Sequence, residues 1–101
     1  MNYANQFGYS DVSPCEVVKV ISEKTIEIRY MDTEALPWKR EFHPGGFFGN
    51  TSNQNDQKWK ITSNPENHVF RIRLGKNGWK DKYGNRYKLA DKPIKFYDFN
   101  F

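Results

Sequence analysis

The stretch FRIRLGKNGW, residues 70–79, decides the fold. Its first five residues alternate apolar and basic side chains, which a β-strand places on opposite faces. The dipeptide Asn77-Gly78 is typical of a tight hairpin turn, and Trp79 begins another apolar and basic alternation. The stretch therefore predicts two antiparallel strands with one face toward a core and one cationic face toward solvent.

Further strands are expected on both sides of this hairpin. We expect them at Lys58–Thr62, His68–Leu74, Trp79–Tyr83 and Arg86–Leu89, with turns at 63–67, 77–78 and 84–85. Earlier in the chain, the β-branched run from Cys15 to Ile21 and the alternating run from Thr25 to Tyr30 predict another hairpin. We also expect the Lys58–Thr62 strand to pair with the His68–Leu74 strand.

Six short strands, tight turns and no helical periodicity indicate an all-β fold in a single domain, residues 1–101. The preferred architecture is a small barrel, SH3-like or OB-like, with a sandwich as the alternative. Residues 1–13 are expected to form a lead-in or an edge. Residues 31–57 are expected to form a long loop, because prolines, glycines and a polar run interrupt regular structure there. The aromatic tail at 95–101 is expected to pack on the barrel or on a second subunit.

Composition limits the kinds of protein this chain can be. Apolar residues make up 37% of the chain and aromatic residues 17%, so we expect aromatic side chains to supply much of the core. The single cysteine, Cys15, excludes an intrachain disulfide and is expected to be a buried thiol. Its spacing from His43 and His68 does not resemble a zinc site, so no metal or cofactor is expected. No run of apolar residues is long enough to span a bilayer, which predicts a soluble, cytoplasmic protein.

The charge is unevenly distributed along the chain. The net charge is +4, but residues 1–56 hold five Lys/Arg and eight Asp/Glu, a net −3. Residues 57–101 hold eleven Lys/Arg and four Asp/Glu, a net +7. This asymmetry favours a localised cationic patch that binds an anionic partner, and we expect a phosphate-bearing nucleotide or a nucleic acid.

The predicted strands give a set of candidate binding residues whose side chains point outward or flank a turn. These are Lys58, Lys60, Arg71, Arg73, Lys80, Lys82, Tyr83, Arg86, Tyr87 and Lys88. The cations are expected to bind phosphates, and the absence of neighbouring acidic residues in the sequence favours this role. The equally weighted alternative is that they serve only solubility. Tyr83 and Tyr87 are expected to be exposed and able to stack on a base, whereas most other aromatic residues are expected in the core.

The sequence offers little support for catalysis. Cys15 lies at the start of an apolar strand, and His43 and His68 belong to no recognisable nucleophile or metal motif. The glycine-rich segment 43–49 is expected to be a flexible bend rather than an anion-binding loop. We therefore expect a non-enzymatic protein. A metal-independent nuclease assembled from Glu41, His43 and a lysine is the alternative that the sequence leaves open.

Four stretches resemble a group of short uncharacterised proteins found in bacteriophage genomes. They are residues 12–20, 26–29, 70–79 and 96–101, while residues 31–57 depart from the pattern. The resemblance implies a phage accessory protein acting in the host cytoplasm by blocking host defence, sequestering a signalling nucleotide or handling nucleic acid. The alternative function is a protein-interaction module that inhibits a host defence protein through its acidic half or through Phe47 and Phe48.

Overall fold

The structure is a computed structural model that describes residues 2–37, 42–43, 50–51 and 58–97. All regular structure in these residues is β-strand, which confirms the predicted all-β class. The strands are β1 (Tyr3–Phe7), β2 (Val12–Ser13), β3 (Cys15–Ser22), β4 (Thr25–Tyr30), β5 (Asp32–Ala35), β6 (Phe42–His43), β7 (Asn50–Thr51), β8 (Trp59–Thr62), β9 (Val69–Gly75), β10 (Gly78–Lys80) and β11 (Arg86–Ala90). The described ranges therefore contain no helix that could cross a membrane.

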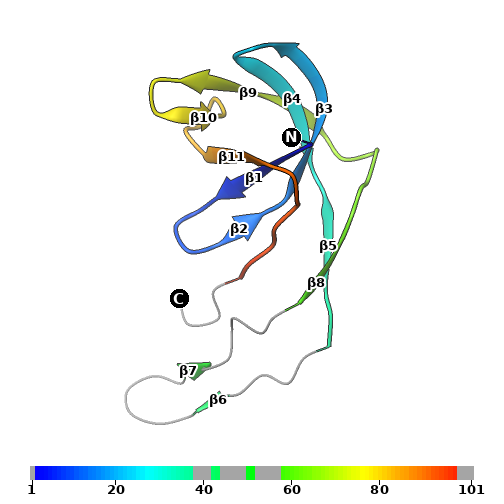
Figure 1. Cartoon of the computed structure of the whole chain (residues 1–101). Helices are drawn as coiled ribbons and strands as arrows, with labels where there is room; N and C mark the ends of the chain where they lie inside the picture. The colour runs from blue at the N-terminus through cyan, green and yellow to red at the C-terminus, as the bar shows by residue number, and fades with distance from the viewer. Residues whose placement is uncertain (1, 38–41, 44–49, 52–57, 98–101) are drawn as a thin grey trace.

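Six strands close into a small antiparallel barrel. The strand order is β11-β10-β9-β4-β3-β1, and β1 also pairs with β11, so the sheet has no free end; β2 is an extra strand beside β1 (Figure 1). The hairpins β3–β4 and β9–β10 form where the sequence predicts them. The prediction of a small antiparallel barrel is confirmed.

The N-terminal segment closes the barrel instead of leading into it. Strand β1 forms a five-residue ladder with β11, from Tyr3 opposite Ala90 to Phe7 opposite Arg86. The sequence YANQF is polar at its centre and lacks β-branched residues, so it carries a weak strand signal. Pairing with a strand about 80 positions away in the sequence supplies the stability that local propensity does not.

A segment near the C-terminus covers the outer face of β1. The Asn5 side chain is only 1% exposed, and its Nδ2 donates to the Lys92 carbonyl at 3.0 Å. Its Oδ1 accepts from the Ile94 N–H at 3.0 Å, so both ends of the buried amide are satisfied. Phe96 then forms two backbone hydrogen bonds with Val12, each 3.0 Å long. The first part of the predicted aromatic tail therefore packs on its own barrel, and residues 98–101 lie outside the described residues.

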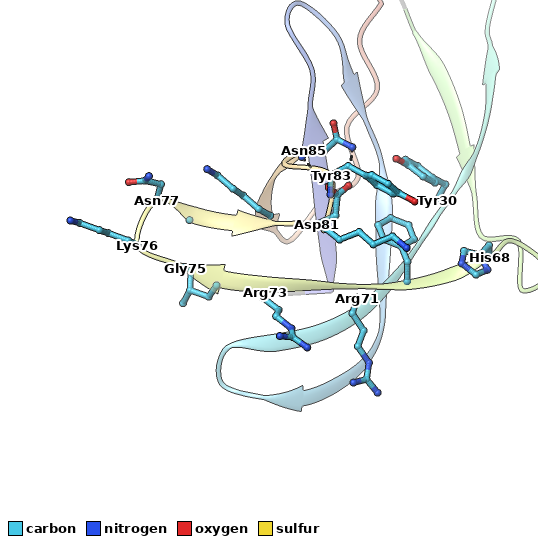
Figure 2. Close-up of a pocket in the computed structure, with 15 residues that line it drawn as sticks. Tyr30, His68, Arg71, Arg73, Gly75, Lys76, Asn77, Asp81, Tyr83 and Asn85 are labelled. Atoms are coloured by element: carbon cyan, nitrogen blue, oxygen red, sulfur yellow. Dashed lines mark hydrogen bonds between the residues drawn. The ribbon is translucent and has the colours of Figure 1, made fainter.

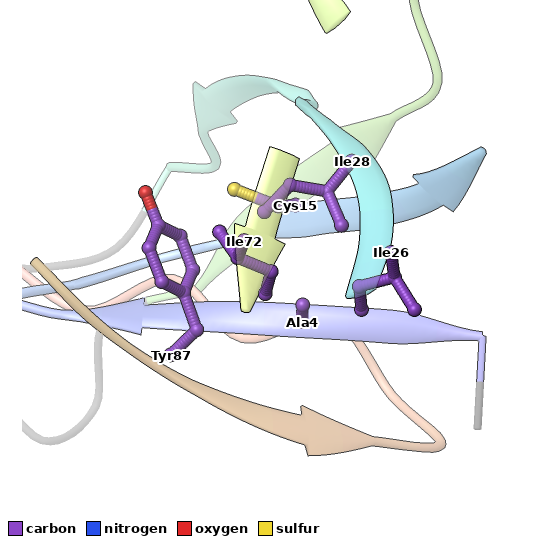
Figure 3. Packing of buried hydrophobic residues seen from close by; sticks show 6 residues of the cluster. All are labelled: Ala4, Cys15, Ile26, Ile28, Ile72 and Tyr87. Atoms are coloured by element: carbon purple, nitrogen blue, oxygen red, sulfur yellow. The ribbon is translucent and has the colours of Figure 1, made fainter. Parts of the chain in front are cut away.

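The buried centre of the barrel is mainly aliphatic. The buried cluster consists of Ala4, Cys15, Ile26, Ile28, Ile72 and Tyr87 (Figure 3). The expectation of a largely aromatic core does not hold for the described residues, because Phe70 and Trp79 are only partly buried around this cluster. Cys15 is buried, which confirms the expected buried thiol. Burial raises the pKa of this thiol to about 12, so it stays protonated at neutral pH.

Strands β5 and β8 form a separate two-stranded arm that extends away from the barrel (Figure 1). Asp32 to Ala35 pair in order with Thr62 to Trp59. The expected pairing of residues 58–62 with 68–74 is therefore wrong. β9 is flanked by β4 along residues 69–73 and by β10 at residues 73–75, whereas β8 pairs with β5 along its whole length. Part of the predicted loop at 31–57 is thus strand, and 38–41, 44–49 and 52–57 lie outside the described residues.

We expect the substitution Ile72→Ala to lower the free energy of unfolding by about 2 to 5 kcal/mol, because Ile72 is fully buried and its truncation leaves a cavity. The matched control is Val20→Ala, since Val20 is a β-branched strand residue that is 67% exposed and should cost less than about 1 kcal/mol. Urea denaturation followed by tryptophan fluorescence measures both. Equal losses in the two variants would contradict this placement of the core.

Candidate functional site

Three basic side chains lie directly opposite one another on three neighbouring strands. Arg73 of β9 is in register with Lys80 of β10, and Lys80 is in register with Arg86 of β11. Residues in register share a face of the sheet, and adjacent strands lie about 4.8 Å apart. We call these three residues the cationic row. They are on the outer face, because Ile72 and Tyr87, their neighbours in the sequence, are buried in the core.

The cationic row continues at both ends into other strands. Thr25 of β4 lies opposite Arg73, and Phe7 of β1 lies opposite Arg86 with 41% of its surface exposed. Lys88 shares the outer face of β11 with Arg86 and lies opposite Asn5. A phosphate on the row would therefore meet several cations and have an exposed aromatic ring beside it.

Arg71 belongs to the same face but is paired. Its Nε donates to Glu27 of β4 at 3.0 Å, and Arg29 is likewise paired with Glu16 of β3. The expectation that acidic residues are absent around the cations is thus wrong for Arg71, because the register of β4 and β9 places Glu27 opposite it. The ion pairs lie on the β3–β4 side, so the positive charge increases toward β10 and β11.

Three candidate residues lie elsewhere. Lys58 directly precedes β8 on the arm, and Lys60 lies within β8, opposite Glu34. They do not join the cationic row. Tyr87, which was expected at the surface, is only 5% exposed. Its ring therefore cannot stack on a ligand, because it points into the barrel from the strand position between two outward cations.

The carboxylate of Asp81 organises the loop between β10 and β11. Oδ1 accepts from the N–H groups of Tyr83 at 2.8 Å and Asn85 at 3.0 Å. Oδ2 accepts from Asn85 Nδ2 and from the Tyr87 hydroxyl, both at 2.9 Å. The Tyr87 hydroxyl in turn accepts from Gln6 Nε2 at 3.0 Å. Gly84 has φ +87°, which only glycine adopts easily, so this loop has one defined shape.

The same hydrogen bonds shift the pKa values of Asp81 and Tyr87. Burial alone would raise the pKa of Asp81, but the hydrogen bonds from Asn85, Tyr87 and Tyr83 outweigh it and lower the pKa below 3.8. Burial, followed by the hydrogen bond to Asp81, raises the pKa of Tyr87. The carboxylate is therefore ionised, and Tyr87 is neutral, across the physiological range.

A cavity of about 980 Å³ lies along β9 and β10, between the turn at 75–78 and the loop at 81–85 (Figure 2). Its aromatic part consists of Tyr30 and Phe70, whose ring centroids are 5.4 Å apart, and Tyr83. Tyr83 is 79% exposed, and Lys82 Nζ lies 5.1 Å from its ring centroid. Figure 2 shows Tyr30, Asp81 and Tyr83 on one side of β9 and the side chains of Arg71 and Arg73 on the other.

Four residues of this region were not among the candidate binding residues predicted from the sequence. Phe7, Tyr30, His68 and Asn77 border the cationic row or the cavity. The Asn77-Gly78 turn was predicted, but its position beside a cavity was not. Nothing in the sequence brings Phe7 to Arg86, because that contact depends on the closure of the barrel by β1 and β11.

The described residues contain no group of three or more His, Cys, Asp or Glu side chains that could hold a metal ion. Comparisons with protein-family models, with curated proteins and with solved structures found no match to this chain. The cationic row and the cavity are therefore the features from which a function can be inferred.

The lowered pKa of Asp81 predicts a pH-dependent stability. A carboxyl whose pKa is lower in the folded state stabilises the fold above its unfolded pKa, and this stabilisation is lost as the pH falls through the folded pKa. We therefore expect Asp81→Asn to be less stable than the wild type at pH 7, with the difference shrinking as the pH falls through the unfolded pKa of the carboxyl group, about 3.9, and on through its lower folded pKa. Urea denaturation at several pH values measures it, and a difference that is the same at every pH would argue against the ionised carboxylate.

Proposed function

We propose that this protein is a non-enzymatic binding protein for a phosphate-bearing ligand, a nucleotide or a nucleic acid, held on the wall formed by β9, β10 and β11. The observation that carries the proposal is the cationic row, in which Arg73, Lys80 and Arg86 meet in register on three adjacent strands. Basic side chains in such an array attract phosphates and release the counterions bound to them.

Solubility alone is a weaker explanation for these cations. A soluble sheet surface usually mixes charges of both signs, and the β3–β4 side of this barrel does so with the Arg29–Glu16 and Arg71–Glu27 pairs. Across the cationic row, like charges lie opposite one another, which destabilises a sheet. Placing Arg73, Lys80 and Arg86 side by side costs stability, and binding of an anionic ligand explains this cost better than solubility does.

An open binding surface is favoured over an enclosed nucleotide trap. The cavity beside the row is open to solvent, and Tyr83 at its border is 79% exposed. A small anion is usually held in a concave pocket that covers most of its surface. The alternative of a protein-interaction module depends on the acidic N-terminal half or on Phe47 and Phe48, and these two residues lie outside the described residues.

Charge reversal in the cationic row tests the proposal. We expect the double substitution Arg73→Glu and Arg86→Glu to weaken binding of fluorescein-labelled oligonucleotides or nucleotides at least about tenfold, because it turns attraction into repulsion. Fluorescence anisotropy at fixed salt measures the affinity. Both side chains are exposed, so the fold should survive, and a thermal unfolding curve checks this.

The matched control is the double substitution Lys58→Glu and Lys60→Glu. It changes the net charge by the same amount on the arm, away from the row. We expect it to weaken binding by much less than the row variant. Equal losses in the two variants would reduce the effect to overall net charge and would sink the proposed site.

A further inference from the structure

We propose that the ligand is a single-stranded nucleic acid that lays its phosphates on the cationic row and inserts a base into the cavity beside β9. This inference rests on the proposed function and adds a ligand class and a second contact. The base would lie between the exposed ring of Tyr83 and the aromatic pair Tyr30 and Phe70, all three of which line the cavity.

The first argument is an unfilled edge of strand β9. Leu74 N–H donates to the Lys24 carbonyl at 2.8 Å, so the backbone groups of Leu74, Ile72 and Phe70 point toward β4. Those of Arg73, Arg71 and Val69 point toward β10. The ladder with β10 ends at the pair Arg73 and Lys80, so the N–H and C=O groups of Arg71 and Val69 lie beyond the end of β10, and Arg71 lines the cavity.

The second argument is the chemistry that surrounds this edge. A base needs an aromatic surface for its face and hydrogen-bonding groups for its polar rim. Tyr83 and Tyr30 provide the aromatic surface, and the backbone of Arg71, on the open edge of β9, provides the hydrogen-bonding groups. Lys82, whose Nζ lies 5.1 Å from the Tyr83 centroid, supplies a cation at the border between the cavity and the solvent.

Geometry separates a single strand from two other occupants. A peptide strand added to β9 would need a longer edge, since strands usually run five or six residues and only two residues are open here. A base paired in a duplex has its faces stacked and cannot enter the cavity without being extruded. A single strand presents unstacked bases and a flexible backbone, which fits a short edge beside a row of cations.

Substitution of Tyr83 tests the base contact. We expect Tyr83→Ala to weaken binding of labelled oligothymidylate and oligouridylate by about fivefold to about a hundredfold, the usual loss for one stacked base. Tyr83→Phe keeps the ring and should bind within about twofold of the wild type. The control is Tyr9→Ala, because Tyr9 is 93% exposed and does not line the cavity. It should leave the affinity unchanged.

Three labelled probes separate this inference from the proposed function: oligothymidylate, thymidine monophosphate and a DNA duplex of the same length. The affinity of each is measured for the wild type and for the Arg73→Glu, Arg86→Glu variant. We expect oligothymidylate to bind more tightly than thymidine monophosphate and than a duplex of the same length. Tighter binding of the duplex or the mononucleotide would overturn the inference, and so would unchanged binding of oligothymidylate by Tyr83→Ala. The proposed phosphate site would still hold in these cases if charge reversal weakens binding. If none of the three probes binds the wild type, both proposals fail.

Discussion

The carboxylate of Asp81 determines where strand β10 leaves strand β9. It accepts hydrogen bonds from the Tyr83 and Asn85 backbone, the Asn85 amide and the Tyr87 hydroxyl, all between 2.8 and 3.0 Å. The chain therefore turns back one residue after Lys80 and enters β11. This turn leaves part of β9 without a neighbour, exposes Tyr83, buries Tyr87 and places Arg86 opposite Lys80.

The elements set by short-range rules could be predicted from the sequence. Alternation in residues 70–74 and the Asn77-Gly78 turn predict β9, its inward Ile72 and its outward Arg73, and all three are found. The β3–β4 hairpin follows from its β-branched runs in the same way. Strand β1 and the pairing of β8 with β5 could not be predicted, because both depend on which edges are still free once the barrel closes.

The candidate site divides along the same line. Alternation predicted that Arg73, Lys80, Arg86 and Lys88 face outward, which requires only the period of a strand. Whether those cations lie together depends on register between strands. The observed register places Lys60 on the arm and not in the cationic row, and it places Glu27 opposite Arg71. It also places Phe7 at the end of the row, opposite Arg86. Tyr87 was misjudged because its position beside a turn suggested exposure, whereas its strand parity sends it into the core.

The surface of this barrel is thus divided by charge. Glutamates pair with arginines on the β3–β4 side, whereas Arg73, Lys80 and Arg86 lie opposite one another on β9, β10 and β11 beside an open strand edge. The ion pairs follow from the register of β3, β4 and β9, and the open edge follows from the β9–β10 ladder that stops at Lys80. The coincidence of the cationic row and the open edge on one wall, and the aromatic cavity next to them, is what favours a phosphate-bearing strand as the ligand.

Backbone amide mapping tests this account most directly. In a ¹⁵N-labelled sample titrated with oligothymidylate, we expect the amide signals of Val69 and Arg71 to shift and their hydrogen exchange to slow, because these groups lie on the open edge of β9 beyond the end of β10. The amides of Phe70 and Ile72, which point toward β4, serve as controls in the same strand and should change much less. Perturbations that gather on β5 and β8, or that are equal at all four amides, would contradict the binding wall described here.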